Sequence, residues 1–170
     1  NWELFGAAAI RQGYDMYATE KTPDKDQFAQ YLNYVRRKNK ITFCNVEKEN
    51  MYRFCLKAFK SNKPVMIAVD TGATDSDKNV ALEFLGKKLP VANGWATLAL
   101  KAQPVILPLF MTHNGKNHEA VFGEIIDPVG FADEQSLMAH TLRFFEAQVT
   151  AHPDEWLLPL STSEVEKTFG

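Results

Sequence analysis

The chain has 170 residues, of which 45% are hydrophobic and 24% charged, a composition that excludes a disordered chain and is typical of a globular domain. Its formal net charge of −2 excludes the strongly positive field of a protein that binds nucleic acid. We therefore expect a single domain over residues 1–170 and no nucleic-acid partner. Because the chain begins at Asn1 and not at methionine, we expect this domain to be truncated at its N-terminus.

The first half of the chain predicts helices that alternate with strands. A stretch rich in alanine predicts the first helix, and Thr22-Pro23-Asp24 is a helix-start signal followed by apolar residues at helical spacing. The apolar run 64–69 ends at Asp70 and is typical of a fully buried central strand. The expected helices span 2–11, 24–35 and 51–59, and the expected strands span 14–19, 41–46 and 64–69.

The second half predicts three further strands and two helices. A short strand at 80–85 and a helix at 93–102 follow a polar loop, and a second buried strand is expected at 104–111. A turn and a hairpin partner at 119–126 follow, and 133–150 predicts a long amphipathic helix. The candidates for the apolar face of that helix are Leu137, His140, Phe144 and Val149. Helices alternating with buried strands predict an α/β sandwich whose mixed sheet is flanked by helices.

Two cysteines are present, Cys44 and Cys55. They show neither a CxxC pattern nor the spacing of metal ligands, so we expect buried thiols in a reducing compartment and no metal site. A single disulfide between them is the alternative. No apolar run approaches the roughly 20 residues that cross a bilayer, and no signal peptide is recognisable.

Four segments stand out in the order Asn1-Trp2-Glu3-Leu4, 56–70, 83–110 and 144–157. Together they resemble the bacterial lipid A biosynthesis acyltransferases, of the lauroyl- and myristoyl-transferring type within the lysophospholipid acyltransferase superfamily. Asn1-Trp2-Glu3-Leu4 resembles the end of the family's HFGNWE-type motif, whose histidine would lie three residues before Asn1. Residues 56–70, 83–110 and 144–157 resemble the segments that follow it in the family, at similar spacing. The resemblance implies a sandwich of the glycerol-3-phosphate-acyltransferase-like type.

The resemblance also implies an activity. The enzyme would transfer a fatty acyl chain from acyl carrier protein or acyl-CoA to a hydroxyl of a glycolipid acceptor, as in lipid A and lipopolysaccharide biosynthesis, with no cofactor and no metal. It would act at the cytoplasmic face of the bacterial inner membrane, through segments that this chain lacks. Because the motif histidine is also missing, a non-catalytic acyl- or lipid-binding fragment or pseudo-enzyme is the alternative.

The site residues follow from the matched positions. Glu3 matches the catalytic acid that orients the histidine base, although an acid in a first helical turn is also favoured by the helix dipole alone. Arg37 is the best match for an arginine that binds phosphate, and Arg36 is the next. The remaining substrate-binding candidates are Asn1, Asp70 at the end of the central strand, and Gly86 and Gly94 in a loop that shapes the groove.

Three features compete with this interpretation or depart from the family pattern. Asp70-Thr71-Gly72 matches the aspartic-protease motif, but the spacing to the next motif element is too short and the helical stripes do not fit a β-rich protease. Ser61-Asn62 stands where the family often has glycine. The tail 157–170 lacks the basic stretch of lipid A enzymes, which argues against lipid A itself as the acceptor, because its phosphates favour basic partners.

Overall fold

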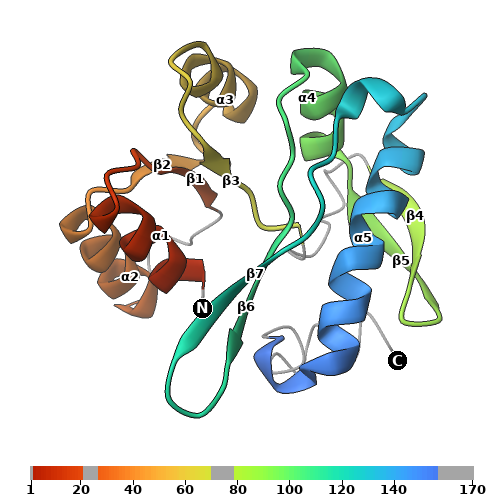
Figure 1. Ribbon diagram of the computed structural model, residues 1–170. Helices are drawn as coiled ribbons and strands as arrows, with labels where there is room; N and C mark the ends of the chain where they lie inside the picture. The colour runs from red at the N-terminus through yellow and green to blue at the C-terminus, as the bar shows by residue number, and fades with distance from the viewer. Residues whose placement is uncertain (1, 21–26, 70–78, 157–170) are drawn as a thin grey trace. The chain divides into compact units, whose positions relative to one another are not determined.

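The computed structural model describes residues 2–20, 27–69 and 79–156. They form two compact units, which we call the N-terminal unit (residues 1–68) and the C-terminal unit (residues 69–170) (Figure 1). Both combine helices with short strands, and parallel and antiparallel pairing are both present, so the predicted α/β class is confirmed.

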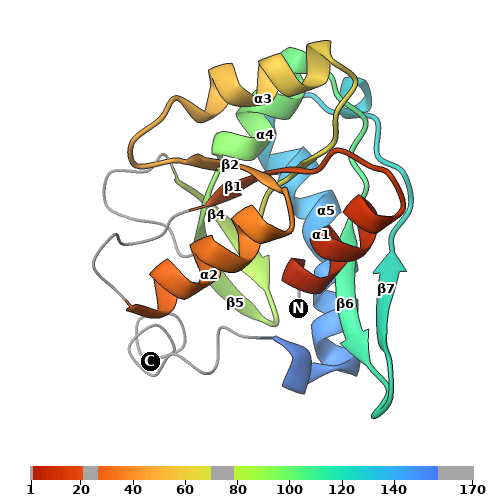
Figure 2. The ribbon, with the colours of Figure 1, turned by 90° about the vertical axis from the view of Figure 1, so that its left-hand side faces the viewer.

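The N-terminal unit is a small parallel sheet with helices on both faces. Its sheet has the order β2-β1-β3, and β1 pairs with both neighbours in parallel register. Helices α1 and α2 lie on one face of the sheet and α3 on the other (Figures 1 and 2). The elements are α1 (Trp2–Arg11), β1 (Tyr17–Glu20), α2 (Gln27–Lys38), β2 (Thr42–Asn45), α3 (Met51–Lys60) and β3 (Val65–Met66).

One strand of this unit differs from the prediction. The run 64–69 was expected to form a buried central strand, but β3 covers only Val65–Met66, is half-buried and lies at the end of the described sheet. The central strand is β1, whose Ala18 is almost fully buried. An apolar run indicates burial, but the order of strands depends on pairing between distant segments, which the run does not encode.

The end of α3 explains one departure from the family pattern. Asn62 has a φ of 52°, in the left-handed region that glycine adopts most readily and that asparagine tolerates. Its amide donates to the Phe59 carbonyl at 2.9 Å, and the Lys63 amide donates to the Ala58 carbonyl at 3.0 Å. These two bonds form a Schellman motif, so Asn62 ends the helix in the conformation that a glycine would adopt.

The core of the N-terminal unit lies between α1 and the sheet. Met16, Ala18 and Ile41 are its buried members, and α1 approaches them at Gly6. A Cβ atom on Gly6 would lie 2.7 Å from Cδ1 of Ile41, so the absence of a side chain allows the close approach. This contact holds the first turn of α1, which contains Glu3, against the sheet.

Both cysteines are free thiols and fully buried, as predicted. Cys44 lies on β2 and Cys55 on α3, which packs against that strand. Burial, with a smaller effect of the neighbouring Cys44, raises the pKa of the Cys55 thiol to about 11. Because the thiolate is the reactive form, these residues belong to the packing of the unit and not to its chemistry.

The C-terminal unit packs two helices and two antiparallel ribbons around one core. The residues at the centre of that core include Ala96, Leu137 and Met138, all fully buried. Helix α5 contacts both α4 and β4. The elements are β4 (Asn79–Phe84), β5 (Lys87–Ala92), α4 (Gly94–Ala102), β6 (Leu109–His113), β7 (His118–Phe122), the 3-10 helix η1 (Pro128–Gly130), α5 (Glu134–Ala151) and the 3-10 helix η2 (Pro153–Glu155).

Two predictions for this unit are wrong. The run 104–111 was expected to be a buried strand, but β6 begins at Leu109 and Val105 is 69% exposed. Pro104 and Pro108 cannot donate to a ladder, and the intervening Ile106 forms only an isolated bridge with Ile126.

His140 was expected on the apolar face of α5 and is exposed. The buried side of the helix is set by Leu137, Met138, Thr141 and Leu142, whose shared direction lies well away from that of His140 at 100° per residue. Leu137 and Val149 are buried as predicted.

Gly123 provides a test of packing in the C-terminal unit. A Cβ atom there would lie 2.9 Å from the Phe144 ring and 3.1 Å from Pro108, and neither group can move aside cheaply. We expect Gly123→Ala to lower the free energy of unfolding by about 1–3 kcal/mol, the usual effect of overpacking. Urea denaturation in a Trp2→Phe background measures it through the remaining tryptophans. The matched control is Gly130→Ala, whose Cβ would meet no atom within 4 Å; an equal effect there would contradict the packing argument.

Candidate active site

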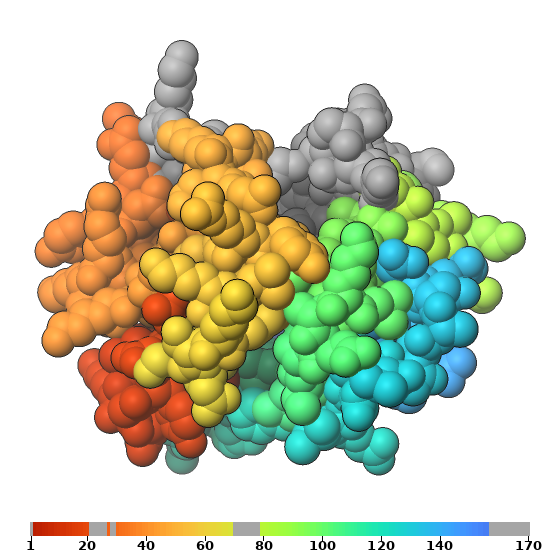
Figure 3. Space-filling model, turned by 90° about the horizontal axis from the view of Figure 1, so that it is seen from above, coloured from red at the N-terminus to blue at the C-terminus, as the bar shows by residue number. Residues whose placement is uncertain are grey.

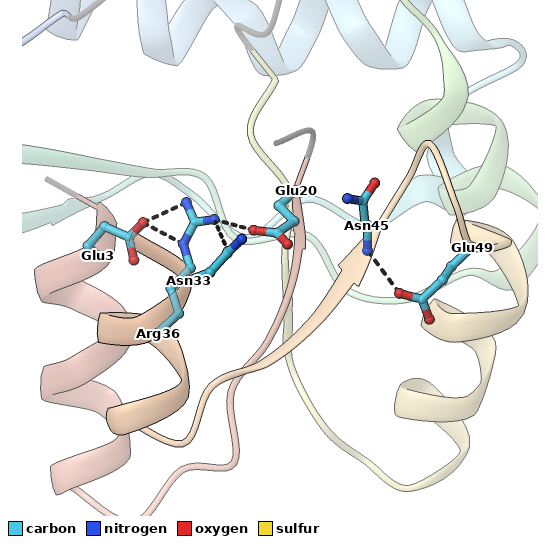
Figure 4. Close-up of polar contacts among 6 residues, drawn as sticks. All are labelled: Glu3, Glu20, Asn33, Arg36, Asn45 and Glu49. Atoms are coloured by element: carbon cyan, nitrogen blue, oxygen red, sulfur yellow. Dashed lines mark hydrogen bonds and ion pairs between the residues drawn. The ribbon is translucent and has the colours of Figure 1, made fainter. Parts of the chain in front are cut away.

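A buried arginine joins two glutamates in the N-terminal unit (Figure 4). Nη2 of Arg36 lies 2.7 Å from Oε1 of Glu3, and Nε donates to the same oxygen at 2.8 Å. Nη1 forms an ion pair with Oε2 of Glu20 and also donates to Oδ1 of Asn33 at 3.5 Å. All the nitrogens of one guanidinium are therefore engaged within this unit.

Aromatic rings enclose this guanidinium. The Cζ atom of Arg36 lies 4.8 Å from the centroid of the Trp2 ring and 4.8 Å from that of Phe43, within the range of cation–π attraction. The side chain of Arg36 is 6% exposed, that of Glu20 10% and that of Glu3 26%. The ion pairs are thus largely shielded from water. Away from water, the attraction between opposite charges is stronger.

The three charged groups of this cluster come from the ends of elements. Glu3 stands in the first turn of α1, Arg36 in the last turn of α2, and Glu20 is the last residue of β1. The positions of Glu3 and Arg36 suit the helix dipoles, which favour acids at the N-terminus and cations at the C-terminus. Asn33 reaches the guanidinium because it precedes Arg36 by three residues on the same helix face.

The arrangement separates the two oxygens of Glu3. Oε1 accepts both hydrogen bonds from Arg36, whereas Oε2 has no partner among the residues that the structure describes. A carboxylate fixed through one oxygen can accept a hydrogen bond from an imidazole through the other. The geometry is therefore compatible with the orienting role predicted for Glu3.

The two neighbouring arginines have different surroundings. Arg36 was a candidate for binding phosphate, but one cation here already faces two carboxylates. Arg37 is exposed and lines a pocket of about 270 Å³ together with Glu20, Asn33, Arg36, Ile41 and Phe43. Of the two, Arg37 has the charge and the access that an incoming anion requires.

The glycine candidates lie in the C-terminal unit. Gly86 forms the turn between β4 and β5 with a φ of 73°, a left-handed conformation that glycine favours, and Gly94 begins α4 after β5. The β4–β5 register pairs Phe84 with Lys87 and Asn79 with Ala92, so the two glycines stand at opposite ends of the ribbon, roughly 20 Å apart at strand spacing. Asn1 and Asp70 lie outside the described residues.

Sequence reasoning missed Glu20, Asn33 and the two aromatic residues of the cluster. Asn33 could have been found from its spacing to Arg36. Glu20 offered no such signal, because it meets Arg36 across 16 residues of sequence. Trp2 was quoted only as part of the motif, and Phe43 only as part of a strand.

Other parts of the described chain offer less chemistry. A pocket of about 280 Å³ in the C-terminal unit is lined by Glu83, Ala139, Leu142, Arg143 and Glu146, none of them a predicted site residue. Within residues 2–20, 27–69 and 79–156, no three metal-ligating side chains gather in one place. The same residues contain no helix with the length and apolar character of a membrane span.

Comparison with known proteins agrees with the motif at the start of α1. The family model described as bacterial lipid A biosynthesis acyltransferase matches residues 1–160, which include every residue of the cluster around Arg36. No curated protein matches the chain.

Proposed function

The chain belongs to the bacterial lipid A biosynthesis acyltransferases, and we propose that it transfers a fatty acyl chain from a thioester donor to a hydroxyl of a glycolipid acceptor. The donor would be acyl carrier protein or acyl-CoA. The observation that supports this proposal is the fixation of Glu3 by Arg36, which leaves one carboxylate oxygen available. The family excludes the aspartic-protease interpretation of Asp70-Thr71-Gly72.

In the proposed reaction Glu3 orients a base. The motif histidine, which the resemblance places before Asn1, would donate one ring N–H to Oε2 of Glu3 and take the proton of the acceptor hydroxyl at its other nitrogen. The hydroxyl oxygen attacks the thioester carbonyl, the carbon–sulfur bond breaks, and the departing thiolate receives the proton. The products are an ester and a free thiol.

Arg36 and Arg37 have separate roles in this proposal. Arg36 is a positioning residue, because it acts on the reaction only through Glu3. Arg37, at the pocket of about 270 Å³, binds a phosphate of the donor or of the acceptor, for which its planar guanidinium can supply two parallel hydrogen bonds. Membrane association at the cytoplasmic face of the inner membrane, through segments outside this chain, belongs to the same proposal.

Acyl transfer by a chain that includes the motif histidine tests the proposal. Radiolabelled acyl-CoA and acyl carrier protein are each offered with and without a glycolipid acceptor, and the labelled product is resolved by thin-layer chromatography. We expect label to enter the lipid only when the acceptor is present. Comparison of the two donors shows which of them supports transfer. Binding of acyl groups without transfer from either donor would favour the pseudo-enzyme, and release of free fatty acid alone would indicate hydrolysis.

A further inference from the structure

Helix α2 has two contrasting sides. Its six outward residues, Gln27, Gln30, Tyr31, Tyr34, Arg37 and Lys38, are all exposed. At 100° per residue they fall within an arc of about 120°, and Arg36 points away from that arc into the unit. Figure 3, in which this part of the chain is orange, shows the helix at the molecular surface.

The exposed side combines large aromatic rings with cations. Tyr31 is 62% and Tyr34 58% exposed, and both lie on the stripe that continues to Lys38. Arg37 is also exposed, as is Lys40 just past the helix end. The exposed cations here are Arg37, Lys38 and Lys40, and residues 27–46 contain no acidic residue, so this side is locally positive in a chain whose net charge is −2.

We propose that the exposed side of α2 docks on a layer of anionic phospholipid headgroups. Lysine and arginine near an anionic bilayer are attracted to it, and tyrosine favours the interface because its ring is apolar and its hydroxyl polar. An acidic protein partner would explain only the exposed cations. A lipid interface explains both the cations and the two exposed tyrosines on the same stripe.

This docking would place the candidate site beside the lipid. Arg37 belongs both to the exposed side of α2 and to the pocket next to the Glu3–Arg36 pair, so a bilayer touching α2 would meet the mouth of that pocket. The inference concerns binding and requires no turnover. It can therefore fail while acyl transfer is observed, or hold while acyl transfer is absent.

Co-sedimentation of the 170-residue chain with vesicles tests the proposal. We expect binding to vesicles that mix phosphatidylglycerol with phosphatidylcholine, weakened by salt, and no binding to phosphatidylcholine alone. Replacing Arg37, Lys38 and Lys40 by glutamine should lower the partition coefficient on the order of 100-fold, at about 1 kcal/mol for each cation. The pair Tyr31→Ser and Tyr34→Ser should lower it without any change of charge.

The matched control removes the same charge from another helix of the unit. Arg53, Lys57 and Lys60 are exposed on α3, and their replacement by glutamine should leave vesicle binding nearly unchanged. An equal loss in this control would show non-specific attraction and overturn the assignment to α2. The absence of binding to anionic vesicles would also overturn the proposal. This holds even if an acidic carrier protein binds in a way that depends on α2.

Discussion

Replacing Arg36 by methionine is expected to lower the free energy of unfolding of the N-terminal unit by about 3–5 kcal/mol, the usual effect of removing one partner from a buried ion pair. Methionine fills a similar volume between Trp2 and Phe43, so the lost charge and not a cavity is responsible. Without the guanidinium, Glu3 and Glu20 lose the cation that both of them contact. The nearly buried Glu20 carboxylate then loses the positive charge of Arg36 that compensates its own.

The neighbouring arginine provides the control. Arg37→Met removes the same charge from the same helix turn, but at an exposed position, where substitutions usually change stability by less than about 0.5 kcal/mol. Urea denaturation followed by Trp2 fluorescence, with Trp95 and Trp156 replaced by phenylalanine, reports on the N-terminal unit. Equal destabilisation by the two variants would show that the cluster around Arg36 is not what stabilises this unit.

Glu3→Gln should lower kcat by about 10³-fold to 10⁴-fold in a chain that includes the motif histidine. Glutamine retains the shape of glutamate and can still accept from Arg36. It cannot stabilise a protonated imidazole by charge, and its amide group can favour the wrong tautomer of the ring; replacing the orienting acid of a catalytic triad has effects of this size. The KM of the donor should change little, because Glu3 is not expected to touch it.

Glu20→Gln distinguishes catalysis from loosening of the cluster. Both glutamates bind the same guanidinium, so both glutamine variants weaken the hold on Arg36. Glu3, however, stands in the motif that resembles the family's catalytic segment, and its Oε2 has no partner among the described residues. Initial rates of acyl transfer should therefore fall in Glu3→Gln and stay within about tenfold of the parent in Glu20→Gln. Equal losses would mean that the acids maintain the fold and that neither orients the base.

The two predictions together separate the two effects of one ion pair. Arg36 stabilises the unit through Glu20, which is 10% exposed, and positions Glu3, which is 26% exposed. A variant such as Arg36→Lys keeps the charge but loses the planar fork that reaches Glu3 and Glu20 at once. Partial retention of stability with a larger loss of kcat is the expected result for that variant.

Local patterns in the sequence determined the helices and the family. The helix at 2–11 was predicted with the bounds that α1 has, and the stripe beginning at Met51 predicted the start of α3. Helix formation depends on neighbours within a few residues, which a single sequence displays. The same holds for the motif around Glu3, whose resemblance to the acyltransferases agrees with the family match over residues 1–160.

Only the tertiary structure decided which groups meet. Arg36 and Arg37 are adjacent and identical in type, and their different surroundings follow from a rotation of about 100° along α2. Arg36 reaches Glu3 across 33 residues and Glu20 across 16. The position of β3 beside β1 and the exposure of Val105 also depend on tertiary contacts. Such contacts depend on how distant segments pair and pack, and neither periodicity nor composition records that pairing.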